Sequence, residues 1–107
     1  RVLAAMGLAR RARVERGQTI DFPCLDLGKA SVVLFPGETW VGYQLLAQQQ
    51  RPQSTVISIG FGECWPGYIP TTQGFEDNFQ DVWHWVAPGS DERMTEAIRE
   101  VLPAARQ

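Results

Sequence analysis

The sequence predicts a partial α/β domain, and three observations carry that prediction. Range 30–35 is a run of β-branched and large apolar residues, and apolar and small residues alternate over range 56–60, so two buried strands are predicted. The segment between them, 38–50, reads as a helix joined to both strands by short connections, so the strands should be parallel neighbours. Apolar residues recur at helical spacing over 90–102. The expected order is helix, β-hairpin, helix, parallel strand, long loop and helix.

Length and composition set the class of protein. The chain has 107 residues, 44% of them hydrophobic and 21% charged, as in ordinary globular proteins. Ten basic residues against 12 acidic ones give a net charge of −2, which argues against a nucleic-acid partner. No apolar run is long enough for a transmembrane segment. One domain at most is therefore expected.

The first third of the chain predicts a helix followed by the hairpin. Residues 2–14 read as a helix with arginines near its end, stopped by Gly17. The chain begins inside this helix, so we expect it to be the tail of something longer. Residues 19–27 and 30–35 flank a Gly28-Lys29 turn and predict two antiparallel strands, with an edge or bulge at Pro23.

Two chemically reactive positions follow the predicted parallel strands. The first strand ends at Pro36-Gly37, and Glu38 opens the next helix. The second strand runs into a loop rich in Gly and Pro that carries Tyr68. The carboxyl ends of parallel strands are where α/β proteins commonly place ligand sites. Two interpretations remain open at each position: a helix-dipole acid or a ligand for Glu38, and a packed crossover or a site for the loop.

Other candidate residues carry less information. Cys24 and Cys64 match no metal or redox spacing, and two buried free thiols are favoured over a disulfide. His84, the only histidine, is expected to be a packing or surface residue rather than a metal ligand. The aromatic and acidic range 73–86 is expected to be a long connection that packs on a missing part. Ser90 is the expected N-cap of the closing helix.

Two motifs resemble the neutral/alkaline ceramidase family, and most closely its bacterial ceramidase-like hydrolases. They are Leu34-Phe35-Pro36-Gly37-Glu38-Thr39, followed by the Tyr43-Gln44 helix, and Gly67-Tyr68-Ile69-Pro70-Thr71-Thr72. The resemblance covers nearly the whole chain. It implies that residues 1–107 are the C-terminal portion of an α/β catalytic domain whose N-terminal portion is absent.

The resemblance also implies an activity and a metal. The family is a zinc-dependent amidohydrolase that cleaves the N-acyl amide of ceramide-like lipids. Its zinc is held by histidines from the earlier part of the domain together with a glutamate and a tyrosine, which carry over onto Glu38 and Tyr68. These histidines have no counterpart here, so the chain alone should be inactive and the missing N-terminal part should be its partner.

Two other functions stay open on the sequence. The chain can be a non-catalytic relative that binds a lipid or a glycan. It can also be a small α/β domain used for association.

Overall fold

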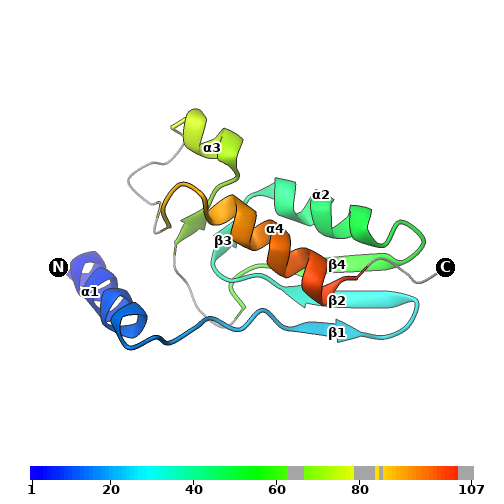
Figure 1. Ribbon diagram of the computed structural model, residues 1–107, viewed down its shortest axis with the longest axis horizontal. Coiled ribbons are helices and arrows are strands. Elements are labelled where there is room, and N and C mark those ends of the chain that lie inside the picture. The colour runs from blue at the N-terminus through cyan, green and yellow to red at the C-terminus, as the bar shows by residue number, and fades with distance from the viewer. Residues whose placement is uncertain (63–66, 79–83, 85, 104–107) are drawn as a thin grey trace.

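The computed structural model describes residues 1–62, 67–78, 84 and 86–103, and these residues confirm the α/β class (Figure 1). The elements along the chain are α1 (Val2–Glu15), β1 (Cys24–Asp26), β2 (Ala30–Leu34), β3 (Glu38–Thr39), α2 (Val41–Gln50), β4 (Thr55–Ile59), β5 (Tyr68–Ile69), α3 (Thr72–Glu76) and α4 (Ser90–Val101). They include both predicted strands of the crossover and the predicted first, middle and closing helices.

The main sheet has the strand order β1-β2-β4. β1 pairs antiparallel with β2 across the turn at Gly28, whose φ of 82° is in the left-handed region that glycine tolerates. β2 pairs parallel with β4 in register from Ala30↔Thr55 to Leu34↔Ile59. The predicted hairpin and the predicted strand–helix–strand crossover are both confirmed.

Helices α2 and α4 pack against each other over one face of this sheet (Figure 1). The core between helices and sheet holds nine buried apolar residues: Val33, Phe35, Tyr43, Ala47, Val56, Ile69, Met94, Ile98 and Leu102. The opposite face is apolar but open, because Leu25, Val32 and Ile57 lie side by side in the register and Leu25 and Ile57 are about half exposed. Among the described residues, helices therefore cover one side of the sheet.

Helix α1 lies apart from the sheet, at the opposite end from the β1–β2 turn (Figure 1). None of its residues is buried, although Val2, Leu8 and Val14 are large apolar side chains. A 14-residue helix without packing is marginal in water. No helix in the described part of the chain combines the length and apolar character needed to cross a bilayer.

Three boundaries differ from the sequence prediction. The middle helix begins at Val41 rather than Glu38, because Glu38 and Thr39 pair with β5 as strand β3. The first strand of the hairpin is limited to three residues, Cys24–Asp26. The N-cap of the closing helix is Gly89, with a left-handed φ of 93°, and Ser90 is its first helical residue. The interpretation of Glu38 as an acid in the first turn of a helix is therefore wrong.

Candidate functional site

A second, two-stranded sheet brings the two predicted site residues together. β3 and β5 pair parallel, with Glu38 opposite Tyr68 and Thr39 opposite Ile69. The Glu38 amide donates to the Gly67 carbonyl at 3.0 Å, and the Trp40 amide donates to the Ile69 carbonyl at 3.3 Å. Both strands are two residues long, so the pairing depends on what holds each segment in place.

The segment before Glu38 is held by the end of the main sheet. The Phe61 amide donates to the Gly37 carbonyl at 2.8 Å, and the Gly62 amide donates to the Phe35 carbonyl at 2.9 Å. A Cβ at Gly62 would lie 3.1 Å from the Phe35 carbonyl oxygen, so glycine permits this close approach. Gly37 turns the chain with a φ of 64° immediately before Glu38.

The two faces of the small sheet have different environments. Residues that are paired in register share a face, and neighbours along a strand alternate. Ile69 is 3% exposed and belongs to the core, so Thr39 and Ile69 form the inward face. Glu38 and Tyr68 lie together on the opposite face and are partly buried. Within the described part of the chain, neither side chain has a hydrogen-bond or ion-pair partner.

His84 is the third member of a row of residues that begins with the pair Glu38 and Tyr68. It forms a single parallel bridge with Tyr68, so Glu38, Tyr68 and His84 follow one another across three adjacent backbone segments. The His84 ring also meets the Phe75 ring edge-on, with centroids 5.1 Å apart. No pattern in the sequence predicts this position, because a one-residue bridge has no periodicity to detect.

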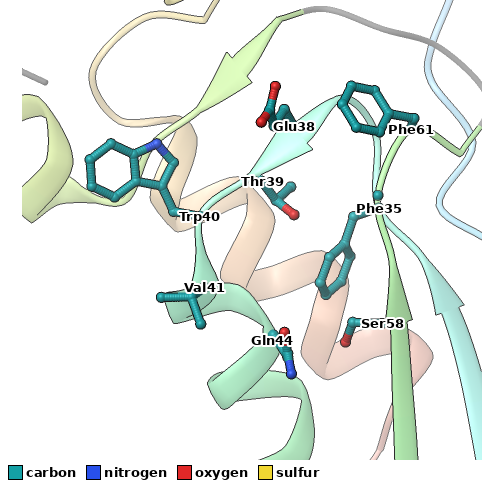
Figure 2. Close-up of a pocket in the computed structure, with 9 residues that line it drawn as sticks. Phe35, Glu38, Thr39, Trp40, Val41, Gln44, Ser58 and Phe61 are labelled. Carbon is teal, nitrogen blue, oxygen red and sulfur yellow. The ribbon is translucent and has the colours of Figure 1, made fainter. Parts of the chain in front are cut away.

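Glu38 also borders a pocket of about 210 Å³ between α2 and the end of β4 (Figure 2). Figure 2 places Glu38 at one end of the pocket and Gln44 and Ser58 at the other. Aromatic side chains from Phe35, Trp40 and Phe61 form much of its wall. The Ser58 hydroxyl is buried and has no hydrogen-bond partner among the described residues. Tyr68 does not line this pocket.

Two polar contacts tie the Tyr68 segment to the helices. The buried Tyr43 hydroxyl of α2 donates to the Pro70 carbonyl at 2.8 Å. The Asp91 carboxylate of α4 accepts from both the amide and the hydroxyl of Thr72, each at 2.8 Å. Burial, together with the nearby Asp91 carboxylate, raises the pKa of Tyr43 well above its usual range. Tyr43 therefore stays protonated and remains a donor to the loop.

The variant Tyr43→Phe tests the hydrogen bond from the Tyr43 hydroxyl to the Pro70 carbonyl. We expect it to lower the free energy of unfolding by about 1–3 kcal/mol, because the buried Pro70 carbonyl loses its donor. The contribution of Tyr43 is present below pH of about 10, the unfolded pKa of tyrosine, and is lost as the pH rises above it. Urea unfolding at pH 7 and pH 10.5 measures both effects. Equal stability of the two proteins at pH 7 would contradict the role of this hydrogen bond.

Cys24, a candidate in the sequence, does not belong to this site. Cys24 is a free thiol on β1, and partial burial raises its pKa, so it is a packing residue of the main sheet. Glu63, Cys64 and Trp65 lie outside the described residues, as does most of the acidic and aromatic range 79–85. The described part of the range 73–86 includes most of α3, which was not predicted.

Within the described ranges, no three His, Cys, Asp or Glu side chains are grouped to hold a metal ion. The row on the small sheet contains two such side chains, Glu38 and His84, with the tyrosine between them. The chain matches no protein-family model, no curated protein and no solved structure. Function must therefore be argued from the site.

Proposed function

We propose that this chain is the C-terminal part of a zinc-dependent amidohydrolase that cleaves the N-acyl amide of a ceramide-like lipid. Glu38 and Tyr68 are the zinc ligands that it contributes, and histidines outside the chain complete the site. The observation that supports this most directly is the pairing of Glu38 with Tyr68 on the outward face of β3 and β5. Residues 30 positions apart meet there without any structural partner for their oxygens within the described residues.

The donor chemistry fits zinc. Carboxylate oxygen is an established zinc ligand, and a catalytic zinc site combines about three protein ligands with an open position. Zinc bound there would acidify a water molecule and polarise a carbonyl oxygen. The Glu38 carboxylate supplies the negative charge that retains a dication. The Tyr68 hydroxyl can donate a hydrogen bond to the oxygen that gains charge when an amide carbon is attacked.

The pocket beside Glu38 suits one part of such a substrate. Its aromatic wall offers apolar contact, and the Gln44 side chain offers hydrogen bonds at its far end. A volume of about 210 Å³ accommodates a small group next to the amide but not a long acyl chain. Most of a lipid chain would therefore lie outside this pocket.

The test is an assay of the full-length protein for zinc content and for hydrolysis of N-acylated amino alcohols. We expect about one bound zinc, activity that a chelator removes and that added zinc restores, and no activity from the 107-residue chain alone. In Tyr68→Phe we expect wild-type stability and turnover reduced about 10²-fold, because the ring still packs while the oxygen that serves the metal or the oxyanion is lost. Hydrolysis that continues after complete removal of zinc would contradict the proposal.

A specific observation favours a second candidate, an association domain. The open face of the main sheet carries the half-exposed side chains Leu25, Ile57 and Ile59, and α1 has no buried residue. Exposed apolar surface of this kind marks contacts with other protein surfaces. A full-length protein that contains neither zinc nor amidase activity but self-associates in sedimentation experiments would support this candidate instead.

A further inference from the structure

We propose that His84 is a third zinc ligand, so that Glu38, Tyr68 and His84 together form a zinc-binding row within this chain. The choice of zinc rests on the proposed function, whereas the row itself rests on the strand pairing. The sequence predicts a packing or surface role for His84, because no second ligand sits at a suitable spacing along the chain. The structure supplies that neighbour through the fold, since His84 pairs with Tyr68 and Tyr68 pairs with Glu38.

The spacing of the row suits a shared ion. Neighbouring strands lie about 4.8 Å apart, so the α-carbons of Glu38 and His84 are separated by roughly 10 Å, with Tyr68 between them. Residues in register direct their side chains to the same face. A carboxylate and an imidazole that lean toward the central phenol can span this gap around one ion, because zinc–oxygen and zinc–nitrogen bonds are each about 2.0–2.2 Å long.

The donor set fits zinc better than other common metals. Calcium and magnesium take oxygen ligands almost exclusively, whereas imidazole nitrogen is a preferred ligand of zinc. Three protein ligands are also the number typical of a catalytic zinc, which keeps a further position for water. With His84 included, this chain supplies three candidate ligands of its own, and fewer histidines from outside the chain are needed to complete the proposed site.

Helix α3 packs beside the row formed by Glu38, Tyr68 and His84. The next positions along β3 and β5, Trp40 and Pro70, are covered by α3, because a Cβ at Gly74 would lie 2.8 Å from the Pro70 ring and 3.0 Å from the indole. Phe75 of the same helix meets the His84 ring edge-on. Glu38, Tyr68 and His84 are all partly buried, which limits competition from solvent.

The experiment uses the only histidine of the chain as a reporter. Zinc is titrated into the 107-residue chain while NMR follows the imidazole nitrogens of His84, and a competing chelator gives the dissociation constant. We expect one imidazole nitrogen to shift with a stoichiometry of one zinc. The variant His84→Phe retains a ring against Phe75. We expect its affinity for zinc to fall about 100-fold or more, because loss of a residue that only hydrogen-bonds to a metal ligand already lowers metal affinity about 10- to 100-fold.

Glu38→Gln should weaken zinc binding to a similar extent, and Glu96→Gln, on the exposed surface of α4, should leave it unchanged. Circular dichroism melts of all three variants verify that the fold is retained. Zinc binding that leaves the His84 nitrogens unshifted, or that is unchanged in His84→Phe, overturns the proposal. Absence of zinc uptake by the chain also overturns it. Neither result affects the amidase assay of the full-length protein, which tests the proposed function separately.

Discussion

Replacing Glu38 with glutamine is expected to remove zinc from the full-length protein and to lower amide hydrolysis by about 10³-fold or more. Glutamine has nearly the same shape, so the backbone bond from residue 38 to the Gly67 carbonyl and the pairing of β3 with β5 should persist. The variant loses only the negative charge that retains a dication. Loss of an essential group at a catalytic centre commonly has an effect of this size or larger. Zinc content by atomic spectroscopy and turnover with an N-acylated amino alcohol measure the two effects.

The control for this variant is Glu96→Gln, which removes one negative charge from the surface of α4. It should match the wild type in zinc content and in turnover. Full hydrolysis by Glu38→Gln would contradict the zinc assignment. Glu38 would then be a polar residue of a two-residue strand, with no role in binding metal.

The main sheet was predictable because its signals are local and redundant. β-branched residues mark both parallel strands, and Gly28 and Pro36-Gly37 mark the turns. The short connections on either side of the middle helix leave a parallel crossover as the natural topology. Local patterns of this kind also predict that Glu38 and the loop leading to Tyr68 follow these two strands.

The small sheet was not predictable, although it forms the site. A strand of two residues is too short to show alternation, so Glu38–Thr39 was read as the beginning of a helix and Tyr68–Ile69 as loop. The two short strands form because Gly60 and Gly62 allow the chain after β4 to approach the end of β2. The Gly67 carbonyl also accepts a hydrogen bond from the Glu38 amide. The position of His84 depends on these tertiary contacts and on the return of the chain after α3.

The last prediction concerns Gly74, the position where α3 lies closest to the candidate site. Alanine is normally better than glycine inside a helix by about 1 kcal/mol. At Gly74 the new methyl group would lie 2.8 Å from the rigid Pro70 ring and 3.0 Å from the Trp40 indole, so α3 must move away from β3 and β5. We expect Gly74→Ala to lower the free energy of unfolding by about 1–3 kcal/mol, as overpacking generally does.

The matched control is Gly7→Ala in α1, where nothing lies within 4 Å of the new Cβ. This change should raise local helix stability, as the intrinsic propensity predicts. Urea unfolding and the zinc titration described above measure both variants. Because α3 carries Phe75, which contacts His84, Gly74→Ala should also weaken zinc binding by the chain, whereas Gly7→Ala should not. If Gly74→Ala stabilises the protein as Gly7→Ala does, α3 does not pack on the small sheet as closely as these distances require.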